Sequence, residues 1–135
     1  MNNPETIRTH AGASVPVLGE SEYRFACIVW QNEPLPSGQL VQLCARQLGW
    51  KKSTTYTVLK NLIQKGLLQN EGGTVTALIK QDAVRRQQSA AVVDRAFEGS
   101  LPRFVAAFLD GKPLSRQDAD AIREMLARYE EGETP

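Results

Sequence analysis

Residues 49–66 read GWKKSTTYTVLKNLIQKG, and this stretch decides the fold of the chain. Apolar residues and one threonine recur in it at spacings of three and four, which predicts a helix over residues 53–64. The stripe that should face a core consists of Thr55, Val58, Leu59, Leu62 and Ile63. The opposite stripe contains only side chains that form hydrogen bonds: Ser53, Tyr56, Thr57, Lys60 and Gln64.

No Asp or Glu occurs between Gly49 and Asn70. A helix with a core face and a face of hydroxyls, amide, phenol and ammonium suits the major groove of DNA and its phosphates. An ordinary amphipathic surface helix has the same outline, so the helix alone leaves both interpretations open. The order of the neighbouring elements is needed to choose between them.

Two further helices are expected upstream, over residues 21–31 and from Ser37 to about residue 48. The prolines of residues 32–36 (NEPLP) separate them, because proline resists helical continuation. Gly49 follows the second helix where a left-handed residue is favoured, and the short connection over residues 49–52 is typical of a helix-turn-helix.

A hairpin is expected after Gly66, with strands over residues 67–70 and 74–79 around Gly72-Gly73. Three helices followed by a two-stranded hairpin is the element order of a winged helix-turn-helix. The predicted fold is therefore mainly α, with a mobile tail over residues 1–18 and a winged helix over 19–80.

Residues 81–135 form a third segment, in which three amphipathic helices are expected without a sheet. Such helices cannot easily hide their apolar faces alone, whereas two-fold pairing with a second copy would hide them. The segment is predicted to make a homodimer through seven apolar residues: Phe97, Phe104, Val105, Phe108, Ile122, Met125 and Leu126.

The composition argues against an enzyme or a metal site. The formal net charge is +1, and the single histidine, His10, lies in the expected tail. Cys27 and Cys44 are each embedded in an apolar pattern, which favours buried free thiols. No cofactor motif, signal peptide or transmembrane run is evident, so we expect a cytoplasmic protein without a cofactor.

With residues 54–68 in view, the chain resembles the penicillinase repressor family of β-lactamase and methicillin-resistance regulators. Thr54, Thr57, Leu59, Leu62, Lys65 and Gly66 match the family pattern, and Trp30 and Trp50 fall where the family favours tryptophan. The resemblance implies a dimeric repressor of a palindromic operator, released through a membrane sensor protease. It implies DNA contacts by Lys51, Lys52, Ser53, Thr54, Tyr56, Thr57 and Lys60.

The chain departs from the family pattern at Tyr56 and Asn61, where basic residues are usual. The expected wing also carries Glu71 and no Lys or Arg. Loss of phosphate contacts lowers affinity and its salt dependence. These departures predict weaker binding, a different operator, or use of the winged helix as a protein-interaction module instead.

Overall fold

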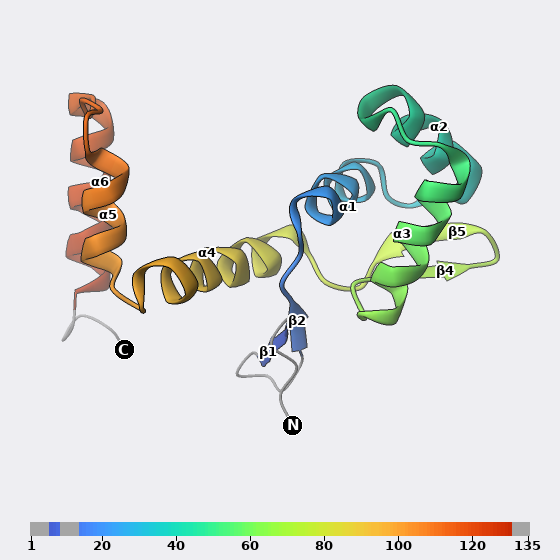
Figure 1. Cartoon of the computed structure of the whole chain (residues 1–135), viewed down its shortest axis with the longest axis horizontal. Coiled ribbons are helices and arrows are strands. Elements are labelled where there is room, and N and C mark those ends of the chain that lie inside the picture. The colour runs from blue at the N-terminus through green and yellow to red at the C-terminus, as the bar shows by residue number, and fades with distance from the viewer. Residues whose placement is uncertain (1–5, 9–13, 131–135) are drawn as a thin grey trace. The chain divides into compact units, whose positions relative to one another are not determined.

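The computed structural model describes residues 6–8 and 14–130, which form two compact units, residues 1–92 and 93–135. Figure 1 shows the elements in chain order. Parts of two predicted segments lie outside the described residues: residues 1–5 and 9–13 of the mobile tail, and residues 131–135 of the third segment. Each unit is considered by itself below.

Three helices build the first unit: α1 (Glu20–Asn32), α2 (Ser37–Leu48) and α3 (Lys52–Gln64). Each lies within two residues of its expected range. Their apolar faces meet in one core, which also takes side chains from the sheet and from a fourth helix, α4 (Gln81–Phe97). Its fully enclosed members include Phe25, Val29, Leu40, Cys44, Leu62 and Leu67.

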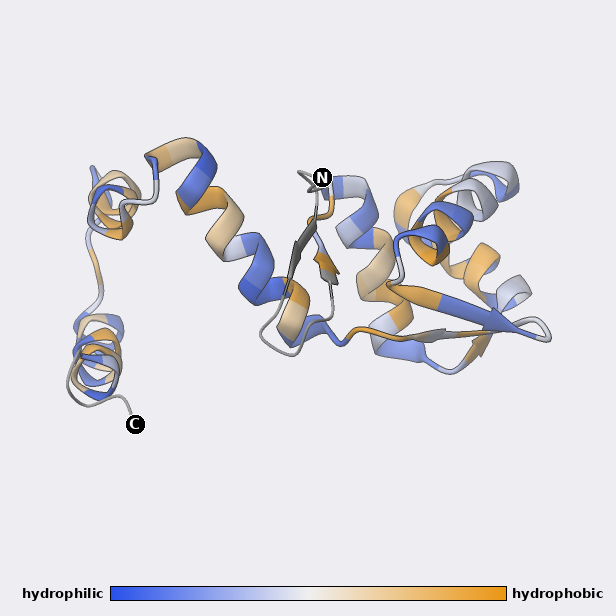
Figure 2. Ribbon diagram, turned by 90° about the horizontal axis from the view of Figure 1, so that it is seen from below, coloured by the Kyte–Doolittle hydropathy of each residue, from blue (hydrophilic) through white to orange (hydrophobic). Residues whose placement is uncertain are grey.

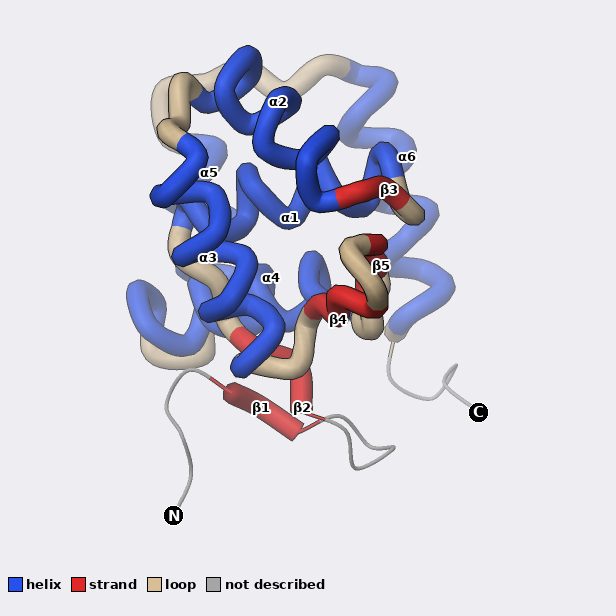
Figure 3. The backbone as a smooth tube through the Cα atoms, turned by 90° about the vertical axis from the view of Figure 1, so that its right-hand side faces the viewer, coloured by secondary structure: helices blue, strands red, loops and turns tan. Residues whose placement is uncertain are grey.

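A three-stranded antiparallel sheet completes the first unit, in the order β3-β5-β4. The hairpin strands are β4 (Leu68–Glu71) and β5 (Thr74–Ala77), and Gly72 and Gly73 have the positive φ angles that the turn requires. The edge strand β3 (Leu35–Pro36) pairs with β5. Figure 3 shows β3, β5 and β4 next to α2 and α3. The winged-helix prediction is confirmed.

The expected mobile tail needs a correction at residues 6–8 and 14–18. Thr6–Arg8 (β1) and Ser14–Pro16 (β2) pair as antiparallel strands. Val15 and Leu18 are buried in the core of the first unit. The buried side chains of Val15, Pro16 and Leu18 dock residues 15–18, and the Leu18 backbone also forms two hydrogen bonds with Gln88.

The boundary between the units lies at residues 92 and 93, within α4 (Gln81–Phe97), and not at residue 80 as expected. Val84 is fully enclosed in the first unit, and Ala91 and Gln87 are also buried. The first part of α4 therefore belongs to the winged helix, because one face of it covers that core.

The second unit contains the end of α4, α5 (Leu101–Leu109) and α6 (Arg116–Tyr129). Ser100 and Ser115 cap α5 and α6 through hydrogen bonds from the amides of Arg103 and Asp118. No residue of either helix is buried, although both are amphipathic. The hydrophobic positions are visible along α4 to α6 in Figure 2.

Candidate nucleic-acid interface

The turn between α2 and α3 sets the position of α3. Gly49 ends α2 with φ 70°, and its amide donates to Ala45 O. The next residue, Trp50, is half-buried and its ring stacks on that of Phe25 in α1, with centroids 5.8 Å apart and planes 12° apart. The left-handed Gly49 and the stacking of Trp50 on Phe25 thus position the start of α3 next to α1.

The inner face of α3 is held by Thr55, Leu59 and Leu62, all buried. The Thr55 hydroxyl donates to Lys51 O and also contacts the Cys44 thiol of α2. Burial raises the pKa of Cys44, and the hydrogen bond with Thr55 offsets part of that rise. Val58 is half-buried, as the stripe predicts, whereas Ile63 lies at the edge of the core and is exposed.

The outer face of α3 is exposed along its whole length. All seven residues expected to contact DNA are exposed: Lys51, Lys52, Ser53, Thr54, Tyr56, Thr57 and Lys60. The Thr57 hydroxyl donates to Ser53 O at 2.9 Å, which leaves its lone pairs directed away from that bond. The structure therefore places these side chains on one helix, at its exposed side and its N-terminal end.

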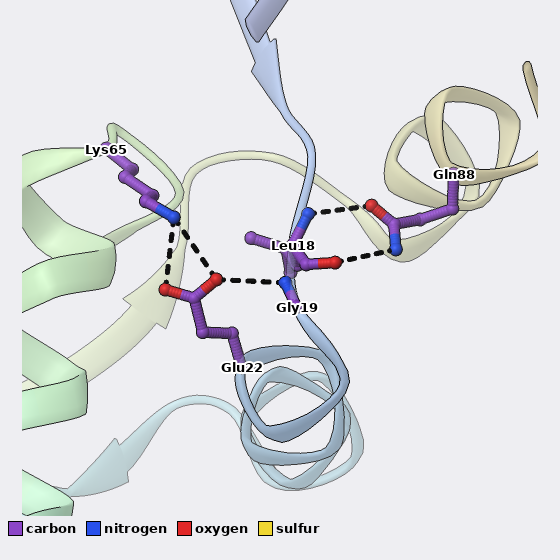
Figure 4. Close-up of polar contacts among 5 residues, drawn as sticks. All are labelled: Leu18, Gly19, Glu22, Lys65 and Gln88. Carbon is purple, nitrogen blue, oxygen red and sulfur yellow. Dashed lines mark hydrogen bonds and ion pairs between the residues drawn. The ribbon is translucent and has the colours of Figure 1, made fainter. Parts of the chain in front are cut away.

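The charge around this face is positive. The sequence has no Asp or Glu from residue 34 to residue 70, which covers all of α2 and α3. Arg46, Lys51, Lys52 and Lys60 form no ion pair with any residue in the described part of the chain. Lys65 differs, because it pairs with Glu22 of α1 at 3.1 Å. Lys65 therefore joins the end of α3 to α1 (Figure 4), whereas Lys51, Lys52 and Lys60 contribute positive charge to the exposed face.

Ser37 is a polar residue next to this face that the sequence placed only at the start of the second helix. It is the first residue of α2, and Tyr56 OH donates to its hydroxyl at 3.4 Å. The Ser37 amide donates to Gly73 O in the wing turn at 2.8 Å. The pairing of β3 with β5 brings α2, α3 and the wing together here, and no local sequence pattern signals that contact.

The wing tip is acidic and not basic, since Glu71 is exposed and pairs across the hairpin with Thr74. Within the described residues, no group of three or more His, Cys, Asp or Glu could hold a metal ion. None of their helices is long and apolar enough to cross a membrane. The exposed face of α3, which has no carboxylate, can bind a polyanion.

Comparisons with known proteins agree on one family. The model of the penicillinase repressor family matches residues 18–128. The chain is 22% identical to a penicillinase repressor from Bacillus licheniformis, over 85% of this chain and 93% of that one. It is 19% identical to the methicillin resistance regulatory protein MecI from Staphylococcus aureus, over 81% and 92% respectively.

A comparison of structures finds a probable transcriptional regulator from Pseudomonas aeruginosa. It is 24% identical, with a TM-score of 0.39, and the match covers 82% of this chain and 77% of that one.

Proposed function

Since this chain belongs to the penicillinase repressor family, we propose that it is a DNA-binding transcriptional repressor that reads its operator with α3. The observation that carries the proposal is the exposed face of α3. It has hydroxyl, phenol and ammonium groups and no carboxylate, on a helix whose other face is fixed in the core.

The chemistry of the face assigns different roles to its residues. Ser53, Tyr56 and Thr57 lie on α3 and suit the donors and acceptors on base edges in the major groove. Lys51, Lys52 and Lys60 suit phosphate oxygens, which fix register without reading sequence. Thr54, at the first turn of α3, also suits a phosphate. Tyr56 stands where the family pattern usually has a basic residue, so we expect a different base preference at that position.

We further propose that the protein acts as a homodimer on a palindromic operator. Val105 and Phe108 of α5 and Ile122, Met125 and Leu126 of α6 are exposed apolar residues in the single chain. Phe97, Phe104 and Phe108 form a row of contacting rings, with neighbouring centroids 5.6 and 6.3 Å apart. A group of exposed apolar side chains marks an interaction site. A second copy of the chain would present the same surface for two-fold pairing.

The proposal is tested by fluorescence anisotropy with labelled duplex from the region upstream of the protein's own gene. We expect specific binding that weakens steeply with salt, because lysine–phosphate contacts release counterions. Reversing two charges with Lys52→Glu and Lys60→Glu should reduce the affinity by at least about a hundredfold at low salt.

A matched control reverses two charges elsewhere in the same unit, with Arg24→Glu on α1 and Arg86→Glu on α4. Both arginines are exposed, and the net charge changes by the same amount as in the lysine pair. The control pair should retain most of the wild-type affinity. Absence of salt-sensitive specific binding by the wild type, or equal losses in the two pairs, would contradict reading by α3.

The alternative is a winged helix that binds another protein and not DNA. The acidic wing is the observation that favours it, because Glu71 repels phosphate. Regulation in cells separates the two: a repression phenotype that survives the Lys52→Glu and Lys60→Glu changes supports the protein-interaction module.

Release of the operator through a membrane sensor protease stays a prediction, as does a cytoplasmic location. The first follows from the family resemblance, and the second from a sequence in which no signal peptide or transmembrane run is evident. Co-expression with a sensor metallopeptidase encoded nearby, followed by immunoblotting after exposure to a β-lactam, tests the pathway. A shorter fragment, cut within residues 93–130, is the expected result, and an intact chain together with lost repression would contradict it.

A further inference from the structure

The phenol of Tyr56 has one hydrogen-bond partner in the described part of the chain, and that partner is the hydroxyl of Ser37. Tyr56 lies on the exposed face of α3 and Ser37 begins α2, so the contact joins the two helices of the helix-turn-helix. Tyr56 OH donates to Ser37 Oγ at 3.4 Å. A phenol is a stronger donor than an aliphatic hydroxyl, which favours this direction of the hydrogen bond. The function proposed above gives Ser37 no role.

The position of Ser37 is fixed independently of Tyr56. The Ser37 amide donates to Gly73 O in the wing turn at 2.8 Å, and the preceding residue, Pro36, belongs to β3, which pairs with β5. In the first turn of α2, Leu40 is fully enclosed in the core. Figure 3 shows α2 beginning where β3 ends. The wing and the core therefore hold the Ser37 hydroxyl at one place beside α3.

This contact decides which hydrogen-bonding role the phenol takes on DNA. In the free protein the hydrogen bond is long and exposed, so water competes with it and it adds little to stability. When α3 enters a major groove, water leaves this face, and the phenol proton goes either to Ser37 Oγ or to an acceptor on a base. An amino group on a base can donate to the phenol oxygen while the bond to Ser37 persists. An acceptor on a base has to take the proton away from Ser37, so no hydrogen bond is gained.

We propose that Ser37 is a positioning residue: it holds the phenol of Tyr56 as an acceptor, so that Tyr56 selects a base with an amino group in the major groove. Adenine presents such a group at N6 and cytosine at N4, whereas guanine and thymine present acceptors. The inference rests on the proposed reading of an operator by α3. It gives the consequence of a phenol where the family pattern has a basic residue, because a basic side chain donates, most often to guanine.

The first experiment finds the base pair that Tyr56 contacts. The full chain selects duplexes from a randomised library, and Tyr56→Phe, which removes only the hydroxyl, selects from the same library. The contacted pair is the position at which the wild type has a preference and Tyr56→Phe has none. A motif in which Tyr56→Phe keeps every preference would overturn the inference.

The second experiment removes the amino group at that pair. The adenine or cytosine is replaced, at one copy of the position, by the analogue with hydrogen in place of the amino group, and anisotropy measures the affinity. The wild type should bind about three- to tenfold more weakly, which is the effect of one neutral hydrogen bond. Tyr56→Phe should bind both duplexes equally, which controls for the altered base pairing. Equal wild-type affinities for the two duplexes would contradict an accepting phenol.

The role of Ser37 is tested by reversing the contacted pair, so that its two bases exchange strands and an acceptor faces the phenol. The wild type should lose about three- to tenfold in affinity. Ser37→Ala should lose less than about twofold, because its phenol proton is free to bind the acceptor. Ser37→Thr retains a hydroxyl and should restore the wild-type preference. The control Ser89→Ala removes a hydroxyl that is bonded within α4, and should keep that preference.

Ser37→Cys provides a further variant in case Ser37→Ala fails to fold. A thiol is a weaker acceptor than a hydroxyl, so its preference should fall between those of the wild type and Ser37→Ala. A preference that stays at the wild-type level in these variants overturns the inference, even where Ser37→Ala weakens binding to both duplexes equally, since that pattern indicates a phosphate contact. A wild type that selects no motif would instead contradict the proposed function.

Discussion

At the scale of single residues, the sequence predicted which α3 side chains are exposed. It did not predict which contacts some of these side chains and their neighbours make with other elements. Period and composition predicted which α3 side chains are exposed, because both are local properties of one helix. Lys65 matched the family pattern together with residues of α3, yet its side chain pairs with Glu22 of α1, forty-three residues away in sequence. The hydrogen bond from Tyr56 of α3 to Ser37 of α2 likewise joins residues that are distant in sequence. Contacts between elements decided these roles.

Glu71 offers a direct test of the wing. Changing it to Lys removes a charge that repels phosphate and adds one that binds it. We expect tighter operator binding and a salt slope steeper by about one unit for each wing that contacts DNA. Salt titrations by anisotropy measure both quantities.

Glu20→Lys is the matched control for that change, since Glu20 is exposed on α1 and the charge difference is the same. The control should leave the salt slope unaltered. If both variants gain equally, net charge and not a wing contact explains the effect.

The two cysteines should differ in reactivity. The sequence predicted two buried thiols, whereas Cys44 is buried and Cys27 is only half-buried. Burial also raises the pKa of Cys44, which keeps it in the unreactive thiol form. A disulfide reagent at pH 8 should modify Cys27 readily and Cys44 only on unfolding. Equal rates for both, measured by mass spectrometry, would contradict the core packing around α2.

At the scale of elements, helices were predictable and strand partners were not. Apolar spacing, the prolines of residues 32–36 and Gly49 placed α1, α2 and α3 within two residues, and Gly72-Gly73 marked the wing turn. β3 escaped notice because it has two residues, one of them Pro36, and exists only through its pairing with β5. An edge position tolerates that proline. The packing of residues 14–18 and of early α4 depended on long-range contacts in the same way.

Two glycines in and beside α2 test the geometry of the turn before α3. Gly49 has φ 70°, so Gly49→Ala should destabilise the fold by about 1 kcal/mol through backbone strain. Gly38 lies in the first turn of α2, and Gly38→Ala should stabilise by up to about 1 kcal/mol.

Neither added methyl group meets an atom within 4 Å, so the comparison isolates backbone conformation. Urea unfolding followed by circular dichroism gives both free energies of unfolding. Equal effects at the two sites would argue against a left-handed Gly49.

At the scale of the whole molecule, the second unit carries the exposed apolar surface on which the proposed homodimer rests. Its described helices leave large apolar side chains exposed, including Leu126 at 58% and Phe108 at 58%. Small chains bury a lower share of their surface, so burial of these side chains against a second copy would stabilise the fold. The sequence predicted this role from the absence of a sheet, and the exposure of α5 and α6 supports it.

Leu126→Asp should shift the dimer towards monomer, because it places a carboxylate in the proposed interface. Gln117→Asp adds the same charge at an exposed polar position of α6 and should leave the dimer intact. Light scattering after size exclusion measures the molar mass of each variant. Anisotropy should show a lower operator affinity only for the variant that becomes monomeric. A Leu126→Asp dimer as stable as the wild type would contradict the interface.

The central claim is that two α3 helices read one operator, and hydroxyl-radical footprinting of the upstream region tests it most directly. The account predicts two protected stretches related by a palindrome, with centres about 34–36 Å apart along the duplex or a multiple of that distance. Lys52→Glu with Lys60→Glu should abolish both stretches together. Protection of one isolated stretch, protection that survives this variant, or no protection at micromolar protein would contradict it.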